Sequence, residues 1–206
     1  MSPFEQAADR RGTPADLLVL GLGNPGIDYA RTRHNAGADC VAVLAARHGE
    51  RLSLAKKERA EVAELRPAPT MHRLVVAVPT TFYNEAGAAA RALVKRFGID
   101  TPTKVVVVHD ELDLPTGRIK VKVGGGLAGN KGLKSITGHL GTDEFLRVRI
   151  GVGKPPGSQH GRDHVLRRPG KRDREELDIA IADAADAVEL ILEDGVERAM
   201  ERHNRR

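Results

Sequence analysis

Residues 104–110 read Lys-Val-Val-Val-Val-His-Asp, and this stretch decides the fold. Four consecutive valines are apolar on both faces and β-branched, which is typical of a central strand buried on both sides. A second apolar run, Leu-Leu-Val-Leu-Gly-Leu-Gly at residues 17–23, predicts another buried strand nearer the N-terminus. Strands of this kind belong to parallel sheets that helices cover on both faces, so the two runs predict an α/β fold.

Outward from these two strands, helix and strand patterns alternate along the chain. Apolar residues at helical spacing predict helices over residues 35–47, 84–97, 131–140 and 172–193. Further strands are predicted over residues 61–66, 73–78, 118–123 and 145–152. This alternation indicates one α/β domain with a twisted, mixed and largely parallel sheet flanked by helices. Residues 1–15 lack periodicity and are expected to be a flexible leader, which leaves residues 16–206 as the single domain.

Composition narrows the functional classes. Of the 206 residues, 40% are hydrophobic and 30% are charged, which excludes a wholly disordered chain. No apolar run approaches the roughly 20 residues of a membrane helix, and residues 1–15 contain no apolar segment typical of a secretory signal. Cys40 is the single cysteine, which excludes an internal disulfide and a cysteine-rich zinc site. We therefore expect a cytoplasmic protein. Its net charge of +5 permits a polyanionic partner without requiring one.

Polar side chains follow the ends of three predicted strands. Asn24 follows the first strand, Asn84 follows the strand that ends at Val78, and Asp110 follows the valine strand. His34 precedes the next helix at the same edge. Because ligands of open α/β sheets bind at the carboxyl ends of parallel strands, we expect these four side chains to lie close together.

This set of residues suits general-base hydrolysis. A neutral imidazole can take a proton from water while a carboxylate on its other nitrogen fixes the tautomer, and amides can hold a carbonyl oxygen. Each residue also has an ordinary structural explanation. His34 could lie at the surface, Asn24 could belong to a turn, and Asn84 could cap a helix. Asp110 could cap a turn, so only the convergence of the four favours a site.

Aromatic residues are scarce, and half of them flank the proposed site. The chain holds two Tyr, four Phe and no Trp. Tyr29, Phe82 and Tyr83 all lie next to the predicted strand ends, and unpaired nucleotides are commonly held by stacking on such rings. The alternative is that Phe82 packs beneath the following helix.

Other chemistries find little support in the sequence. Residues 21–26 match the G-x-G-x-x-G dinucleotide fingerprint, but Pro25 removes an amide that should face the phosphates and no helix begins at once. Cys40 falls on the apolar face of its predicted helix, which favours a place in the core. The eight histidines form no dense metal-ligand pattern, so we expect no metal site.

Together, several motifs make the chain resemble the bacterial-type peptidyl-tRNA hydrolase family. The resemblance extends from residue 16 to about residue 195, with the motifs in family order. They are Gly-Leu-Gly-Asn-Pro-Gly at 21–26, Arg-His-Asn-Ala-Gly at 33–37, Pro-Thr-Thr-Phe-Tyr-Asn at 79–84, His-Asp-Glu-Leu-Asp-Leu-Pro at 109–115, Gly-Gly-Gly at 124–126 and Arg-Ile-Gly-Val-Gly-Lys-Pro at 149–155. The family has a single α/β domain with a mixed twisted sheet.

The resemblance implies an activity and a set of roles. The family cleaves the ester that joins a peptide to the 3′ adenosine of tRNA, which recycles tRNA from chains dropped by the ribosome, and it uses no metal or organic cofactor. By motif, His34 resembles the catalytic base and Asp110 its supporting carboxylate, while Asn24 matches the residue that distinguishes blocked from free aminoacyl groups. Further matches are substrate-binding positions and basic positions that contact tRNA phosphate. They are Tyr29, Phe82 and Asn84 for the substrate, and Lys120, Lys122 and Arg149 for phosphate.

One motif departs from the family pattern. Where the family usually reads Gly-His-Asn-Gly, residues 129–132 read Gly-Asn-Lys-Gly, so that Lys131 occupies the Asn position. In a helix one residue turns a side chain by about 100°, and Asn130 would recover the substrate contact only if the backbone shifts. Lys131 could instead pair with phosphate or with the ester carbonyl. The departure leaves open a divergent paralogue with altered activity.

The sequence therefore predicts a monomeric, cytoplasmic hydrolase of peptidyl-tRNA, with Asn130 and Lys131 among its candidate substrate- and tRNA-binding residues. The alternative is an RNA-binding paralogue with weak or lost catalysis. Both predict salt-sensitive RNA binding, and only turnover separates them.

Overall fold

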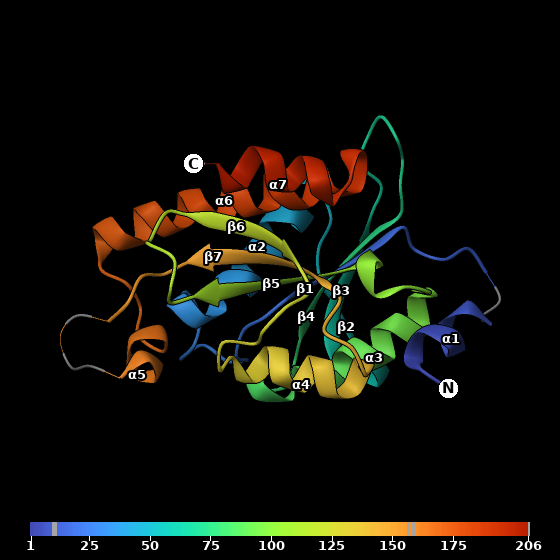
Figure 1. The fold of residues 1–206 in the computed structure, drawn as a ribbon, viewed down its shortest axis with the longest axis horizontal. Helices are drawn as coiled ribbons and strands as arrows, with labels where there is room; N and C mark the ends of the chain where they lie inside the picture. The colour runs from blue at the N-terminus through green and yellow to red at the C-terminus, as the bar shows by residue number, and fades with distance from the viewer. Residues whose placement is uncertain (10–11, 156, 158–159, 206) are drawn as a thin grey trace.

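The computed structural model describes residues 1–9, 12–155, 157 and 160–205, and these contain a seven-stranded sheet (Figure 1). The strands are β1 Leu17–Gly21, β2 Ser53–Ala55, β3 Ala60–Leu65, β4 Leu74–Pro79, β5 Val105–Glu111, β6 Ile119–Val123 and β7 Leu146–Gly151. Their order across the sheet is β2-β3-β4-β1-β5-β7-β6. Strands β4, β1, β5 and β7 are parallel, whereas β2, β3 and β6 pair antiparallel. The predicted mixed sheet with a parallel centre is confirmed.

Helices cover both faces of the sheet. They are α1 Pro3–Ala8, α2 Ala36–Arg47, α3 Ala86–Phe97, α4 Lys131–Leu140, α5 Gly161–Val165, α6 Lys171–Asp194 and α7 Val196–Asn204. Short 3-10 turns are η1 Arg33–Asn35, η2 Lys56–Glu58, η3 Tyr83–Glu85 and η4 Pro102–Lys104. In Figure 1, α6 and α7 lie above the sheet, and α1, α3 and α4 lie below it. The molecule is thus a three-layer α/β/α structure.

The central strands supply side chains to two cores because successive residues point to opposite faces. In β1, Leu17 and Val19 pack in a core with α2 and α6, while Leu18 and Leu20 pack in the other core with α3 and α4. The four valines of β5 divide between the two cores in the same way. All seven residues of β5 are buried, which explains why its sequence carries no polar alternation before His109.

The ends of the chain differ from the sequence-based expectation. The residues of the proposed flexible leader include α1, which begins at a Ser2 capping box and packs against α3 through buried Phe4 and Ala7. Residues 10–11 of that leader lie outside the described part of the chain. The last predicted helix is α6, and Gly195 then starts the further helix α7, which contacts β6. Among the described residues, no helix combines the length and apolarity needed to cross a membrane.

Candidate active site

The carboxyl ends of β1 and β5 lie side by side. Gly21 is in register with Val108, and the N–H of Leu22 donates to the carbonyl of Val108 at 2.9 Å. The segment after β1 therefore passes next to Asp110, which belongs to the last residues of β5 rather than following it. This parallel pairing brings two distant motifs to one edge of the sheet.

Glycines allow the start of α2 to approach this edge closely. A Cβ atom on Gly37 would lie 2.6 Å from the backbone nitrogen of Leu22, so a side chain cannot be accommodated there. The close contact places η1, the turn that precedes α2, directly against the end of β5. His34 lies in this turn, and its position over Asp110 follows from the packing of backbone on backbone.

Arginines hold the segment that leads into η1. Arg33 is buried and its guanidinium pairs with Asp173 of α6 at 2.8 Å. Arg168 donates to the carbonyls of Ala30 and Ile27 at 2.9 and 2.8 Å. These contacts fix the chain on the N-terminal side of His34 to the start of α6 and to the segment that joins α5 to α6.

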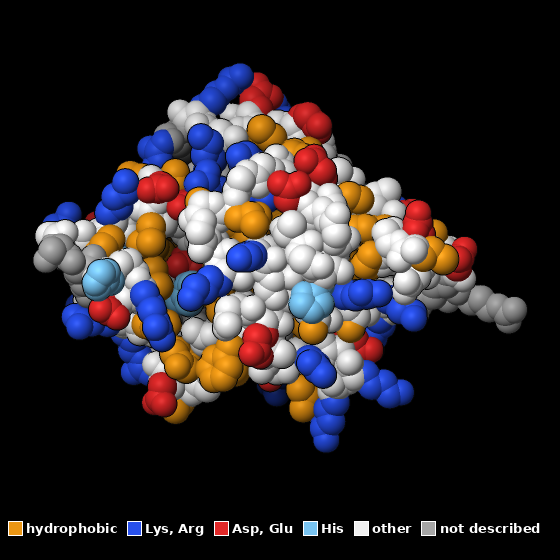
Figure 2. Space-filling model, turned by 60° about the horizontal axis from the view of Figure 1, so that its bottom comes forward, with side chains coloured by type: hydrophobic (Ala, Val, Ile, Leu, Met, Phe, Trp, Pro, Cys, Tyr) orange, Lys and Arg blue, Asp and Glu red, His pale blue; other side chains and the backbone are white. Residues whose placement is uncertain are grey.

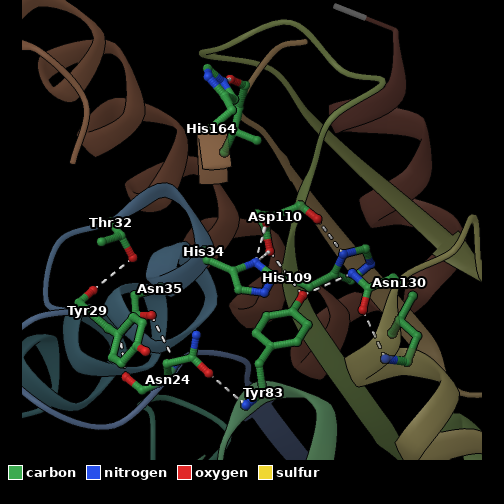
Figure 3. Close-up of polar contacts among 12 residues, drawn as sticks. Asn24, Tyr29, Thr32, His34, Asn35, Tyr83, His109, Asp110, Asn130 and His164 are labelled. Carbon is green, nitrogen blue, oxygen red and sulfur yellow. Dashed lines mark hydrogen bonds and ion pairs between the residues drawn. The ribbon is translucent and has the colours of Figure 1, made fainter. Parts of the chain in front are cut away.

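His34 and Asp110 form a hydrogen-bonded pair. The Nδ1 atom of His34 lies 3.0 Å from both carboxylate oxygens of Asp110, whose side chain is 5% exposed (Figure 3). An ionised carboxylate only accepts, so Nδ1 carries the hydrogen and Nε2 of the neutral ring carries the lone pair. Burial opposes the charge of Asp110, but His34 and the hydrogen bonds from His34 and Tyr83 outweigh it and lower the pKa of Asp110. No described protein group bonds to Nε2, and the side chain of His34 is 20% exposed.

Tyr83 contacts both members of this pair. Its ring stacks on the imidazole of His34, with centroids 3.6 Å apart and planes 14° from parallel. Its hydroxyl donates to Oδ1 of Asp110 at 3.0 Å. Burial and the charge of Asp110 raise the pKa of Tyr83 well above its ordinary value, so the phenol stays a proton donor in this hydrogen bond.

Asn24 is held in a single orientation. Its backbone N–H and carbonyl bond to the side-chain amide of Asn35, both at 2.9 Å. Its own side-chain oxygen accepts the backbone N–H of Tyr83 at 2.9 Å. Because this contact identifies the oxygen, the amide nitrogen occupies the other side of the group, where Figure 3 shows it turned toward His34. Asn24 therefore presents a hydrogen-bond donor to the site.

The side chains described so far form one active-site cluster of Asn24, His34, Tyr83 and Asp110. Asn130 joins this cluster, whereas Lys131 does not. Asn130 caps α4, because its Oδ1 accepts the N–H of Leu133 at 3.0 Å, and its Nδ2 donates to the Tyr83 hydroxyl at 2.9 Å. Lys131 is the first residue of α4 and is exposed. The side chain that faces the cluster is therefore the asparagine one position earlier, held there as the N-cap.

The remaining substrate-binding candidates lie at the outer edge of the site. Tyr29 and Phe82 meet edge to face with ring centroids 6.3 Å apart, and Phe82 is 50% exposed. Phe82 thus lies at the surface rather than beneath the following helix. Asn84 lies in η3 and is exposed, and no hydrogen bond joins it to His34, Asp110 or Asn24 within the described chain. Of the four strand-end residues, three meet and Asn84 stays apart.

Basic side chains line one face of the β6–β7 pair. Lys120 is in register with Arg149 and Lys122 with Arg147, so the four lie on the same face of the sheet. Lys122, Arg147 and Arg149 also line a cavity of about 330 Å³, together with His109 and Glu111. Figure 2 looks onto the side of α3 and α4 and shows further Lys and Arg side chains spread among apolar and acidic ones.

Both arginines on this face of the β6–β7 pair bind other groups of the chain. Arg149 pairs with Glu111 of β5, with Nη2 2.7 Å from Oε2. Arg147 is buried and donates to the carbonyls of Gly125 and Gly126 at 2.6 and 2.8 Å, so the triple-glycine loop is bound to β7. Within β7 the loop therefore covers Arg147, while Arg149 on the same face stays partly exposed.

His109 lies beside the pair but differs from His34 in its surroundings. Its Nδ1 donates to the carbonyl of Asp110 at 2.8 Å, and burial lowers the pKa of its imidazole. Burial also raises the pKa of the Cys40 thiol to about 12, which fits a core residue. Within the described parts of the chain, no three His, Cys, Asp or Glu side chains are grouped to hold a metal ion.

Two contributors to the site carry no assigned role in the sequence-based prediction. Tyr83 is predicted there only as an aromatic near the strand ends, and Asn35 only as part of a motif. Tyr83 is the residue before Asn84, so a one-residue difference on a 3-10 turn decides which side chain enters the cluster. The signal that could have found Tyr83 is its hydroxyl, because a buried tyrosine at a polar strand end needs a partner.

Comparisons with known families and sequences agree with this geometry. Residues 18–206 match the family model described as peptidyl-tRNA hydrolase. A peptidyl-tRNA hydrolase of Cutibacterium acnes is 47% identical over 195 residues, covering 91% of this chain and 97% of the relative. One from Mycolicibacterium gilvum is 48% identical over 183 residues, covering 89% and 94%.

Solved structures give the same result. The crystal structure of peptidyl-tRNA hydrolase from Acinetobacter baumannii at 1.00 Å resolution superposes with a TM-score of 0.85. The two chains are 34% identical, and the match covers 94% of this chain and 97% of the other. At this identity and coverage, the likeness extends to sequence as well as to fold.

Proposed function

This chain belongs to the peptidyl-tRNA hydrolase family, and on that premise we propose that His34 and Asp110 perform its reaction at the carboxyl ends of β1 and β5. The chain hydrolyses the ester bond between peptide and tRNA in peptidyl-tRNA. The observation that carries the assignment is the His34–Asp110 pair, in which Nδ1 is bound at 3.0 Å and Nε2 faces no protein group among the described residues.

The proposed reaction uses His34 as a general base. Neutral Nε2 removes a proton from water while the water oxygen attacks the ester carbonyl carbon. The resulting imidazolium is stabilised by Asp110 through Nδ1–H, as in other base–carboxylate pairs. When the tetrahedral intermediate breaks down, the ribose 3′-oxygen leaves and takes the proton back from Nε2. The products are a free peptide acid and a tRNA with its 3′-hydroxyl restored.

Asn24 supplies the proposed discrimination between blocked and free aminoacyl groups. Its amide oxygen is bound to the Tyr83 N–H, so the side of the amide facing the site is a donor. A peptide carbonyl next to the ester can accept this hydrogen bond. A free α-ammonium has only donors and would lose hydration without gaining a partner, which disfavours unblocked aminoacyl-tRNA.

The aromatic pair is proposed to hold the 3′ end of the tRNA. Tyr29 and Phe82 form an edge-to-face pair at the surface of the site. Ring faces of this kind stack with unpaired bases. Asn84 is exposed on the same turn as Tyr83, where it can bond to the terminal nucleotide or to the peptide.

The tRNA phosphates are assigned to the basic face of the β6–β7 pair. Lys120 and Lys122 have no ion pair within the described chain, whereas Arg147 is bound to the carbonyls of the glycine loop and Arg149 shares its charge with Glu111. Lys131 is exposed at the start of α4 and is assigned to the same phosphate surface. Binding through such contacts weakens as salt rises.

The alternative of an RNA-binding paralogue without catalysis depends on Lys131. Asn130 takes part in the cluster from its N-cap position, so the change at residue 131 removes no contact to His34 or Asp110. We further propose that residues 16–206 work as one hydrolase domain and as a monomer in the cytoplasm. In support, the two cores share one sheet and the whole cluster comes from one chain.

The test is single-turnover hydrolysis of N-acetyl-aminoacyl-tRNA beside the unblocked form. We expect cleavage of the blocked ester only. His34→Ala should lower this rate by about 10² to 10⁴ and leave tRNA affinity within about twofold. His72→Ala is the matched control, because His72 lies in the turn before β4 and contacts Asp16 rather than the site.

Two outcomes would contradict the proposal. A His34→Ala enzyme with near-full rate would remove His34 from the mechanism. Tight tRNA binding by the unaltered protein without any cleavage would move the chain to the RNA-binding class.

A further inference from the structure

We propose that Tyr83 is a positioning residue for the His34–Asp110 pair, holding the imidazole plane by stacking and directing one carboxylate oxygen through its hydroxyl. This inference rests on the proposed roles of His34 and Asp110. It assigns no direct substrate contact to Tyr83, whose side chain is buried.

The first observation is that Tyr83 contacts every other member of the cluster. Its backbone N–H binds Asn24, its ring covers His34, and its hydroxyl lies between Asp110 and Asn130. No other residue of the described site bonds or stacks with all four. Tyr83 therefore couples the donor that faces the peptide to the pair that activates water.

The second observation is that each hydrogen bond at the hydroxyl has a single possible direction. Oδ1 of Asn130 accepts the N–H of Leu133, so the group that faces Tyr83 is the amide N–H₂, which only donates. The phenol oxygen must accept from Asn130 and donate its own hydrogen to Asp110. The chain of donors thus runs from Asn130 through Tyr83 to the carboxylate, and hydrogen bonds in series strengthen one another.

The third observation is that the ring sits in a tightly shaped space. A Cβ atom on Gly132 would lie 2.7 Å from Cδ1 of Tyr83 and 2.9 Å from Cδ1 of Leu22. The ring is thus confined between α4 on one side and the imidazole of His34 on the other. A ring that cannot move restricts rotation of the imidazole stacked on it, which keeps Nε2 aimed at one place.

The hydroxyl also adjusts the basicity of the pair. A donor on Oδ1 withdraws charge from Asp110, so removing it makes the coupled pair hold its proton more tightly. The charged or titratable groups that remain near the pair are His109 and Glu111 on β5 and Arg149 on β7, and none of them is altered by a change at Tyr83. The acid limb of the rate profile should therefore move toward higher pH when the hydroxyl is lost.

The test is Tyr83→Phe, which removes the hydroxyl and keeps the ring. In single-turnover and steady-state hydrolysis of N-acetyl-aminoacyl-tRNA, kcat should fall about tenfold while KM stays within about twofold, because the lost interaction acts on the reacting pair. The acid limb of kcat should move up by at least a few tenths of a pH unit. A purely structural role would change thermal stability without moving that limb.

A second variant keeps the inference testable if Tyr83→Phe folds poorly. Asn130→Ser retains a residue that caps helices well but is too short to reach the Tyr83 hydroxyl. It should lower kcat in the same direction and by a smaller factor, about three- to fivefold, since Tyr83 keeps its own bond to Asp110. The substitution Tyr83→Leu removes both the ring and the hydroxyl, and this variant should be slower than Tyr83→Phe.

The outcomes separate this inference from the proposed function. If His34→Ala retains its rate, the assignment of the base fails, whatever Tyr83 does. If His34→Ala is inactive but Tyr83→Phe keeps the kcat and the pH profile of the unaltered enzyme, only the role of Tyr83 is overturned. A fall in kcat with an unmoved acid limb and a lowered melting temperature would likewise overturn it in favour of packing.

Discussion

Gly132 leaves the space that the ring of Tyr83 occupies, since a Cβ atom there would lie 2.7 Å from Cδ1 of Tyr83. This close contact lies between the first turn of α4 and η3, and it sets how near the ring lies to His34. A methyl group at residue 132 must push the ring toward the imidazole or push α4 outward. Either movement disturbs the bond between Asn130 and the Tyr83 hydroxyl.

Gly132→Ala should therefore destabilise the protein by about 1–3 kcal/mol and lower the rate of ester cleavage about tenfold or more. Urea unfolding and single-turnover hydrolysis measure the two effects. Gly138→Ala is the control within the same helix, because nothing lies within 4 Å of a Cβ there and alanine favours a helix by about 0.5–1 kcal/mol. If the two variants have the same stability and the same rate of ester cleavage, the Tyr83 ring has room to move.

The basic face of β6 gives a prediction about tRNA binding. Lys122→Ala should weaken tRNA binding and lower the slope of log K against log salt by about 1, as expected for one lost phosphate contact. Filter binding of deacylated tRNA over a range of salt concentrations measures the slope. Lys57→Ala is the control, because Lys57 is exposed in η2, next to the opposite edge of the sheet. If both variants keep the slope of the unaltered protein, phosphate does not contact this face.

The parts of the fold that could be predicted from the sequence are those that depend on local pattern. The valines of β5 have no polar alternation, so their burial on both faces follows from composition, and the confirmed parallel centre follows from it. Strand β2 has three residues, and α1 buries few side chains, so neither produces a recognisable period. Their positions are set by pairing with β3 and by packing on α3, which are properties of the folded chain.

In the candidate site, too, some contacts could be predicted from the sequence and others depend on the folded chain. The approach of His34 to Asp110 could be predicted because parallel strand ends meet at one edge of a sheet. The Arg149–Glu111 pair could not, because it depends on the register between β5 and β7. The sequence predicts that Asn130 needs a backbone shift to contribute, whereas its N-cap geometry already turns it toward Tyr83. Cap residues have non-helical backbone angles, so counting about 100° per residue does not apply to them.

The lowered pKa of Asp110 predicts how its contribution to stability depends on pH. A carboxyl group whose pKa is lower in the folded state stabilises the fold above its unfolded pKa, and this stabilisation is lost as pH falls through the folded pKa. The free energy of unfolding of the unaltered protein, minus that of Asp110→Asn, should therefore be larger at about pH 6 than at about pH 3. Urea unfolding at a series of pH values measures the difference. A difference that grows toward low pH would mean that burial outweighs the bonds from His34 and Tyr83.

Asn24→Asp provides a test of the donor that faces the peptide. The substitution keeps an oxygen to accept the Tyr83 N–H and replaces the amide nitrogen with a second oxygen, at almost the same volume. A peptide carbonyl then meets an acceptor, and a free α-ammonium meets a negative charge. Cleavage of N-acetyl-aminoacyl-tRNA should fall about 10- to 100-fold, whereas cleavage of unblocked aminoacyl-tRNA should fall less or rise.

The quantity to measure is the ratio of the two single-turnover rates, because both substrates share any general loss of structure or of base strength that Asn24→Asp causes. Asn24→Ala is the companion variant, since it removes the donor without adding a charge. It should lower the blocked rate and leave the unblocked rate nearly unchanged, so that the ratio falls by a smaller factor than in Asn24→Asp. If both variants lower the two rates equally, Asn24 only supports the Tyr83 backbone, and selection for the blocked substrate must come from another part of the site.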